Sequence, residues 1–385
     1  MVSLDVVIVG AGPAGSTAAL VLARAGARVR LIDRAAFPRQ KLCGDTINPG
    51  TLAALRRLGV ADGIDARGLR IDGMLLTGTR GIAIEGRYPD GLYGRALLRR
   101  DLDWMLLEQA IAAGAQFEAS VPVRRALVER GGAARTVTGV VVAGRRESEV
   151  EVRARVTIGA DGRRSTIAFG LGMAAHPPAP RRWAVGAYCE GGEGLSSLGE
   201  MHVRRGGYIG VAPMPGGIAN VCVVRPSAGG DPDLRDPAAL IIRALAADAR
   251  LAERFARARL VAPPVVLGPL AVDVREASID GLLLAGDAAG FVDPITGDGL
   301  RFAVCGGELA ALAALDALAH GWKGVHDRLR RARSRAFGGK YRFNRALRLL
   351  VSSPQLVEAA AFGARVAPSV LRRVIARAGD CDAAA

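Results

Sequence analysis

The sequence predicts an α/β fold, mixed to α+β over the whole chain, from three of its features. A βαβ pattern opens the chain, where a β-branched run, Val6 to Val9, precedes a glycine-rich turn, an Ala/Leu-rich stretch and a second β-type run. Continuous apolar runs of this kind are typical of buried parallel strands. Two stretches of short alternating strands separated by glycine and proline, 69–95 and 179–274, indicate a β-rich part. The C-terminal stretch is rich in arginine and helical in character.

The glycine-rich turn, Gly10-Ala11-Gly12-Pro13-Ala14-Gly15, has the GxGxxG spacing of a dinucleotide-binding site. Gly10 allows the tight turn, Gly12 lets the backbone approach a pyrophosphate, and Gly15 lets the helix pack closely on the strand. The N-terminus of the helix offers N–H groups and the positive end of its dipole to the phosphates. Asp33 ends the second strand, where an acid accepts hydrogen bonds from a ribose. The motif alone does not distinguish FAD from NAD.

The composition limits the classes of protein to which the chain can belong. Its 385 residues, 50% of them hydrophobic, suffice for one large or two ordinary globular domains. The net charge of +15 reflects either coding bias or attraction to anionic cofactors, lipid surfaces or acidic partners, and no nucleic-acid-binding module accompanies it. The 5 widely spaced cysteines indicate a reducing cytoplasm and no structural metal. We expect no signal peptide and no membrane span, because the best apolar run, Leu309 to Ala319, is short and contains Asp316.

The loop after the second strand carries the first resemblance to a known family. Its segment Lys41-Leu42-Cys43-Gly44-Asp45 resembles the Lys-x-Cys-Gly-(Gly/Asp/Glu) loop of the geranylgeranyl reductase family. This family lies within the group A flavoprotein monooxygenases, which are similar in fold to para-hydroxybenzoate hydroxylase. The resemblance implies that Cys43, Gly44 and Asp45 form a catalytic loop facing the flavin or the substrate; the alternative for Cys43 is a small buried hydrophobe. We place Arg34 and Lys41 among the cofactor-binding residues.

Two further stretches resemble FAD contacts of this superfamily. Arg99, Leu102 and Asp103 match an Arg-x-x-(Phe/Leu)-Asp pattern at a helix start, and an arginine fork suits a pyrophosphate oxygen. A predicted strand ends in Gly159-Ala160-Asp161-Gly162, which resembles the Asp-Gly motif that touches flavin and incoming nicotinamide cofactor. The arginine that usually follows the serine of this motif by three residues is Ala168 here.

A second strong motif begins with a buried apolar strand that leads to a turn, Gly286-Asp287, and then to the start of a long helix. It resembles the second flavin motif of the family, which implies that Asp287 accepts hydrogen bonds from the ribityl hydroxyls and that Pro294 lies along the isoalloxazine. The N–H groups that open the helix offer a positive dipole to the flavin and stabilise its reduced form. The residues concerned are Gly297, Gly299 and Leu300. Because three motifs occur in this order, we predict FAD as the resident cofactor and NAD(P)H as the reductant.

Tyr208, Gly210 and Ala212 occupy alternate positions of one predicted strand, so their side chains share a face. The strand resembles the Tyr-x-Trp-x-Phe-Pro motif of the family, in which Tyr208 and Pro213 match. Gly210 and Ala212 stand where Trp and Phe are usual, so two side chains of about 150–250 Å² each are missing. The resemblance therefore implies a wider substrate pocket; the alternative is that this face packs inside the sheet.

The resemblance covers nearly the whole chain and implies a discontinuous domain organisation. The expected parts are a Rossmann-like FAD-binding domain (1–68, 96–178 and 275–325), a β-rich substrate domain (69–95 and 179–274) and a C-terminal helical region (326–385). The stretch from Trp322 to Leu350 is rich in arginine and is either a solvated helix face or a basic helix on an anionic membrane. We expect a cytoplasmic protein, with peripheral membrane contact as the second interpretation.

We therefore expect an FAD-dependent oxidoreductase that uses NAD(P)H and acts on a hydrophobic, lipid-like substrate. In one reaction the reduced flavin takes up O₂ and the substrate is hydroxylated or epoxidised. In the other, hydride from the flavin saturates an isoprenoid double bond. The missing aromatic side chains favour monooxygenation, and the absence of a Trp-x-Trp-x-x-Pro element disfavours halogenation. An alternative of another class is a non-catalytic flavoprotein or an electron-transfer partner.

Overall fold

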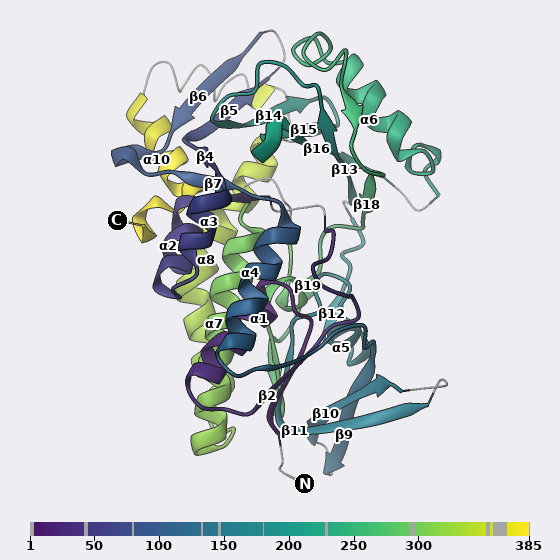
Figure 1. Cartoon of the computed structure of the whole chain (residues 1–385), viewed down its shortest axis with the longest axis vertical. Coiled ribbons are helices and arrows are strands. Elements are labelled where there is room, and N and C mark those ends of the chain that lie inside the picture. The colour runs from purple at the N-terminus through teal and green to yellow at the C-terminus, as the bar shows by residue number, and fades with distance from the viewer. Residues whose placement is uncertain are drawn as a thin grey trace.

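The computed structural model describes residues 4–41, 45–78, 81–131, 134–144, 148–179, 181–227, 230–292, 297–351, 355–356 and 368–384. Its strands form two large sheets and two small ones. A largely parallel sheet lies in the lower part of Figure 1, with long helices packed beside it, and a second sheet lies above it. The predicted α/β class is therefore confirmed.

The first sheet has the strand order β20-β21-β11-β1-β2-β8, and β10 and β9 extend it from β11. The strands are β1 (Leu4–Val9), β2 (Val29–Ile32), β8 (Gln116–Glu118), β9 (Val123–Gly131), β10 (Ala134–Ala143), β11 (Glu149–Gly159), β20 (Ser278–Ile279) and β21 (Leu282–Leu284). β1 runs parallel to both β2 and β11, and Val9 at its end pairs with Ile32 and with Gly159. The carboxyl ends of these strands therefore meet at one edge, where open α/β sheets bind ligands.

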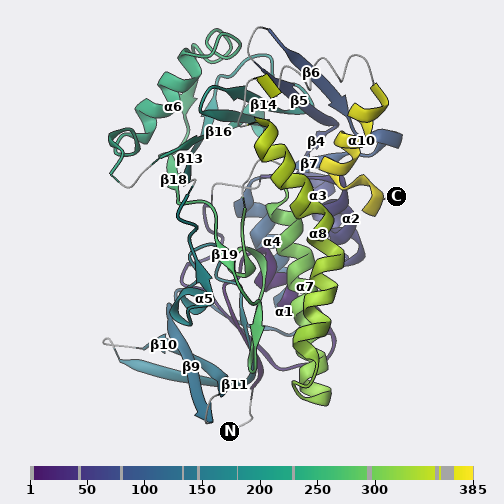
Figure 2. The ribbon, with the colours of Figure 1, turned by 180° about the vertical axis from the view of Figure 1, so that it is seen from behind.

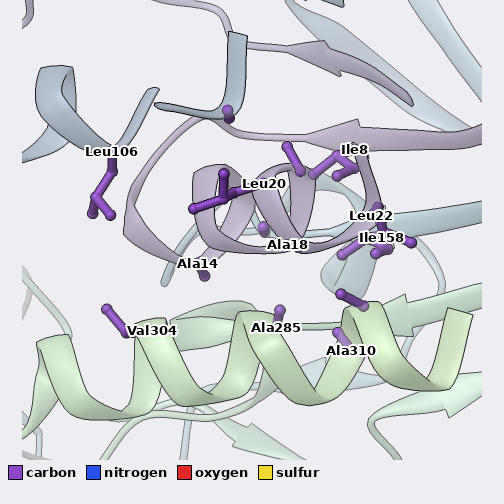
Figure 3. Close-up of a cluster of buried hydrophobic side chains, with 14 of the residues drawn as sticks. Ile8, Ala14, Ala18, Leu20, Leu22, Leu106, Ile158, Ala285, Val304 and Ala310 are labelled. Carbon is purple, nitrogen blue, oxygen red and sulfur yellow. The ribbon is translucent and has the colours of Figure 1, made fainter. Parts of the chain in front are cut away.

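Of four long helices, α1 (Pro13–Arg24) and α7 (Gly299–His320) pack against this sheet, α4 (Arg99–Ala112) packs on α1, and α8 (Val325–Val351) packs on α7. Ile8, Leu20 and Val304 belong to the main hydrophobic core, which Figure 3 shows between β1, α1 and α7. α1 and α7 approach closely at Gly307, which has no side chain. A Cβ atom there would lie only 2.2 Å from the carbonyl oxygen of Ala14. In Figure 2, α8 runs along α7 and continues to the second sheet.

The second sheet has the order β17-β13-β16-β15-β14-β5-β6, with β18 paired to β13. Its strands are β5 (Gly73–Thr77), β6 (Ala83–Arg87), β13 (Arg182–Glu190), β14 (Leu198–Arg204), β15 (Gly207–Pro213), β16 (Ala219–Pro226), β17 (Arg259–Leu260) and β18 (Val265–Leu267). One face packs against α6 (Pro237–Ala246). On the opposite face, Tyr208 packs with Leu347 and Leu350 of α8. The two faces therefore have different partners, and the one with Tyr208 is turned toward the C-terminal helices.

The remaining elements are short strands and further helices outside the two large sheets. They are β3 (Thr46–Ile47), β4 (Leu69–Ile71), β7 (Gly94–Ala96), β12 (Ala174–Ala175), β19 (Asp273–Val274), α2 (Pro49–Arg57), α3 (Ala61–Arg67), α5 (Thr166–Gly170), α10 (Pro368–Gly379) and the short helices η1 (Pro89–Gly91), η3 (Pro215–Gly217), η4 (Pro232–Leu234), η5 (Gly286–Ala289) and η7 (Cys381–Ala383). β4 pairs with β7, which also pairs with β3, so these strands form a small sheet of their own. We retain the domain limits expected from the sequence as a proposal.

One helix within the described ranges, α7, is long and apolar enough to cross a membrane. Leu300, Val304 and Ala310 of this helix are buried in the main hydrophobic core. Packing inside the protein therefore accounts for part of its apolar character.

Candidate flavin-binding site

The glycine turn after β1 is shaped by close backbone contacts. Gly10 has φ +96°, and a Cβ atom there would lie 2.5 Å from the carbonyl oxygen of Ala160. A Cβ atom on Gly15 would lie 1.8 Å from the carbonyl oxygen of Gly10, so this glycine lets α1 approach the strand. Gly12 differs, because its φ of −73° and ψ of −177° suit any residue. A side chain at Gly12 would point toward Arg39, at 3.3 Å from its Nη2 atom, and into the space that a ligand needs.

Asp33 supports this turn from the end of β2. Its Oδ2 atom accepts a hydrogen bond from the backbone N–H of Ala11 at 2.7 Å, and its Oδ1 atom accepts one from Ala35 at 2.8 Å. Each carboxylate oxygen can accept more than one hydrogen bond, so the acid can hold the turn and still accept from a ribose hydroxyl. The sequence predicts only the ribose contact; the contact with the turn is an addition from the structure.

A cavity of about 750 Å³ opens at the carboxyl ends of the parallel strands. The predicted cofactor-binding residues that line it are Gly10, Gly12, Pro13, Ala14, Asp33, Arg34, Lys41, Arg99, Asp161, Gly286, Asp287, Gly299 and Leu300. Two predicted cofactor-binding residues, Gly15 and Gly297, are not among the lining residues. Gly15 lies where α1 packs onto β1, and Gly297, with φ +66°, precedes α7. The structure thus brings together segments that are up to about three hundred residues apart in the chain.

Positive charge gathers where α1 begins. Arg99 donates from Nε and Nη2 to the two oxygens of Asp103 at 2.8 and 3.0 Å, and Arg39 pairs with the same carboxylate at 3.0 Å. Lys41 also lines the cavity. Burial lowers the pKa of Lys41, and the neighbouring cations Arg99 and Arg39 lower it further. These three cations lie together at this part of the cavity, and arginine and lysine side chains suit a pyrophosphate.

Two further acids, Asp161 and Asp287, line the cavity. Burial raises the pKa of Asp287, while the charges of Lys41, Arg163 and Arg99 oppose this shift. Asp161 accepts a hydrogen bond from the N–H of Thr166 at 2.7 Å through Oδ2. Its Oδ1 atom is buried and has no hydrogen-bond partner among the described residues. A buried acceptor without a partner is costly, and hydroxyl groups of a bound cofactor can satisfy it.

These features fit FAD. Gly12 leaves open the approach to the start of α1, the cations suit a diphosphate, and the carboxylates of Asp33 and Asp287 suit ribose and ribityl hydroxyls. Gly299 and Leu300 begin α7, so a second helix N-terminus faces the cavity. When bound, FAD supplies the redox chemistry, and the protein supplies binding, orientation and charge.

Asp45, at the end of the predicted catalytic loop, is buried in a cluster of hydrogen-bond donors. Tyr188 Oη donates to both carboxylate oxygens at 3.1 Å, and the backbone N–H of Arg99 donates at 3.1 Å. Asn220 Nδ2 donates to Asp45 Oδ2. Burial raises the pKa of Asp45 to about 6, although Arg99 and these hydrogen bonds lower it. Tyr188 also lines the cavity, and therefore connects Asp45 with the ligand space.

Other predicted catalytic residues cannot be placed. Cys43, Gly44 and Pro294 lie outside the described residues. Sequence reasoning did not select Tyr188, Asn220 or Arg39 as site residues. Arg39 belongs to the polar loop that follows the second strand of the βαβ unit, so its place in the sequence could have indicated a site residue. Tyr188 and Asn220 are opposite each other on β13 and β16, and only the strand register reveals this.

The predicted substrate residues lie on the face of the second sheet that is turned away from α6. Tyr208 is buried with Val203, Val224 and Leu270. Gly210 is partly exposed, and a Cβ atom there would meet only backbone carbonyl oxygens at 3.9 and 4.0 Å. Ala212 pairs with Asn220, so it neighbours the Asp45 cluster on the same sheet. None of the three lines the cavity described above.

Comparisons with known proteins agree with this site. A family model described as an FAD binding domain matches residues 3–192. The chain is 34% identical over 327 residues to menaquinone reductase of Mycobacterium tuberculosis, covering 80% of this chain and 76% of that protein. It is 32% identical over 323 residues to digeranylgeranylglycerophospholipid reductase 2 of Methanopyrus kandleri, covering 82% of this chain and 77% of that protein.

Solved structures share the fold. A geranylgeranyl bacteriochlorophyll reductase-like protein from Thermoplasma acidophilum has a TM-score of 0.76 at 22% identity, over 91% of this chain and 88% of that one. The flavin-dependent halogenase CmlS has a TM-score of 0.78 at 25% identity, over 89% of this chain. This chain spans only 64% of that halogenase.

The fold, the cavity and these relatives define an FAD-dependent oxidoreductase. Within this class, the chain belongs to the geranylgeranyl reductase family. The predicted FAD cofactor is confirmed, and the non-catalytic alternative is set aside because the relatives are enzymes.

Proposed function

We propose that this enzyme uses NAD(P)H to reduce a carbon–carbon double bond in the isoprenoid part of a lipid-like substrate. This proposal departs from monooxygenation, the reaction that the missing aromatic side chains favour. Relatives at 34% and 32% identity are named reductases, and the name of one specifies a digeranylgeranyl lipid. The observation that carries the proposal is the buried Asp45 carboxyl, connected through Tyr188 to the flavin cavity.

Reduction of a double bond adds a hydride to one carbon and a proton to the other, so the site needs a proton source. Bound FAD, once reduced by NAD(P)H, supplies the hydride. The protonated carboxyl of Asp45 transfers its proton to Tyr188 Oη, while Tyr188 transfers its own proton to the substrate carbon. Asp45 is then a carboxylate that accepts from Tyr188, Asn220 and the N–H of Arg99. Because burial raises its pKa to about 6, Asp45 regains a proton readily near neutral pH.

The apolar chain of the substrate needs a hydrophobic surface beside this proton source. Gly210, Cys222 and Met201 are partly exposed neighbours on the sheet face that carries Tyr188. Leu347 and Leu350 of α8 pack against the same face. We therefore propose that the substrate lies on this face beside α8, where the small residues Gly210 and Ala212 leave room for it.

The test is product analysis under two atmospheres. The purified enzyme is incubated with NADH or NADPH and with a geranylgeranyl-bearing glycerophospholipid, with and without O₂, and the products are analysed by mass spectrometry. We expect products that gain two hydrogen atoms for each double bond, formed equally well without O₂. Products that gain one oxygen atom, and only in the presence of O₂, would contradict the proposal and establish monooxygenation, which the open space at Gly210 favours.

We also propose that the basic C-terminal helices contact an anionic membrane. Leu349 of α8 is 65% exposed and Val370 of α10 is 54% exposed, and both lie among arginines. Exposed apolar side chains flanked by cations suit an anionic lipid surface. We expect the protein to sediment with vesicles that contain phosphatidylglycerol and not with pure phosphatidylcholine vesicles. Absence of sedimentation with both would contradict this contact.

A further inference from the structure

Asp298 directly precedes α7, and its buried side chain is turned away from that helix. The backbone of Asp298 is helical, with φ −77° and ψ −2°, whereas a residue that caps a helix through its side chain has a non-helical backbone. Within the described ranges, the Asp298 side chain makes no capping hydrogen bond with α7. Its carboxylate instead accepts from Asn48 Nδ2 at 3.2 Å and from Asn344 Nδ2 at 3.0 Å, and it pairs with Lys340 Nζ at 3.1 Å.

Lys340 of α8 is a buried cation whose side chain is only 4% exposed. An ammonium group has three N–H donors, and the structure provides an acceptor for each. These are Asp298 and the carbonyl oxygens of Arg377 at 2.5 Å and Ala378 at 2.8 Å. Both carbonyls belong to the last turn of α10, where the helix dipole favours a cation. Lys340 thus ties the end of α10 and the start of α7 to one point on α8.

The same side of α8 reaches the flavin region at a second point. Arg333 donates from Nη2 to the carbonyl oxygen of Ala289 at 3.1 Å. Ala289 ends η5, the short helix that contains the cavity residue Asp287. Residues seven apart share one helix face, so Arg333 and Lys340 act from one side of α8. They hold the end of η5 and the start of α7 in place.

We propose that Lys340 is a positioning residue of the FAD site. Together with Asn48 and Asn344, it balances the buried Asp298 carboxylate directly before α7, so that the first N–H groups of α7 keep their positive field toward the cofactor. Gly299 and Leu300, the first residues of α7, line the cavity. Without the ammonium group, this carboxylate would place uncompensated negative charge beside the start of α7 and weaken that field. The role concerns FAD binding and is the same for reduction and for oxygenation.

The substitution Lys340→Met tests this role, because it removes the ammonium group and keeps the length of the side chain. We expect the FAD dissociation constant of the apoprotein, measured by quenching of flavin fluorescence, to rise at least tenfold, which is about 1.4 kcal/mol. The double variant Asp298→Asn/Lys340→Met removes both charges, and it should bind FAD within about threefold of wild type. Arg330→Met is the matched control, since its side chain is 77% exposed on α8 and should leave FAD affinity unchanged.

If Lys340 only stabilised the fold, melting temperature and FAD affinity would respond differently to the substitution. The melting temperature of the apoprotein would fall in Lys340→Met while the folded protein bound FAD as tightly as wild type, and this result would overturn the proposal. A double variant that binds FAD as weakly as Lys340→Met would overturn it too. If Lys340→Met does not fold, Asn344→Leu removes another of the restraints on Asp298. An increase of about threefold or more in its FAD dissociation constant supports the proposal, and an unchanged constant overturns it.

Discussion

Asp45→Asn tests whether a buried carboxyl titrates near neutral pH beside the flavin cavity. Burial raises the pKa of Asp45 from 3.8 to about 6 in the folded protein. The folded protein therefore binds this proton more tightly than the unfolded chain does. The resulting stabilisation is fully present below the unfolded pKa and is lost as pH rises through the folded pKa. A difference of about two pKa units corresponds to about 3 kcal/mol.

At pH 8 the wild-type protein contains a buried carboxylate, whereas Asp45→Asn contains a neutral amide. We expect the free energy of unfolding of the variant, relative to that of wild type, to increase by up to about 3 kcal/mol between pH 4 and pH 8, so that the variant becomes relatively more stable. Guanidinium unfolding of both apoproteins at the two pH values measures this change. Turnover of the variant should be low and should not follow the decline of wild-type turnover above about pH 6.

Asp72→Asn provides a control of opposite sign. Its pKa is lowered, chiefly by a hydrogen bond from Ser197 and also by Arg70. Stabilisation from Asp72 is therefore present above its unfolded pKa and is lost as pH falls, so Asp72→Asn should become less stable relative to wild type as pH rises. If the stability difference between Asp45→Asn and wild type stays constant from pH 4 to pH 8, the carboxyl does not titrate there and the proton-donor argument is refuted.

Four further substitutions separate cofactor binding from substrate chemistry. Tyr188→Phe removes the hydroxyl between Asp45 and the cavity, so turnover should fall by about 10²–10⁴ at unchanged FAD affinity; normal turnover would exclude Tyr188 as donor. Asp33→Ala should raise the FAD dissociation constant by about one to two decades and also lower the melting temperature of the apoprotein, because two backbone N–H groups lose their acceptor. Gly12→Val should abolish FAD binding while the apoprotein keeps its melting temperature, since the backbone at Gly12 accommodates a side chain; wild-type FAD affinity would contradict the pyrophosphate assignment. Gly210→Trp should keep fold and FAD but lose turnover, because a Cβ atom there meets no side chain within 4 Å; a large drop in melting temperature would instead indicate packing inside the sheet.

The βαβ unit was predictable because local sequence determines it. The strand, the glycine turn and the helix are consecutive, and each glycine has a role that its spacing alone reveals. The second flavin motif was equally visible, since a buried strand leads through Gly286-Asp287 to α7. The helix start predicted at Arg99 is also present, as the first residue of α4.

The donor cluster around Asp45 could not be predicted from sequence, because strand pairing creates it. Tyr188 and Asn220 lie 143 and 175 residues beyond Asp45. The register of β13 and β16 sets the two residues opposite each other, and a shift by one residue would turn either side chain to the α6 face. No periodicity within a single strand carries this information.

The cations of α8 differ in their surroundings. The sequence predicts one role for all of them, on a solvated face or on a membrane. Arg330 is exposed, but Lys340 is buried against Asp298, and burial lowers the pKa of Arg333. Helical spacing shows which cations share a face, but it does not show which face meets α7.

The contrast between Gly10 and Gly12 shows what structure adds to a motif. Gly10 has a positive φ and no room for a Cβ atom, so the fold itself requires glycine there. Gly12 has an ordinary extended backbone, and its missing side chain faces Arg39 and the cavity. Nothing in the folding of the chain explains glycine at that position, whereas a pyrophosphate at the start of α1 does. A glycine that the backbone does not need is therefore a sharper indication of a ligand than one that the backbone does.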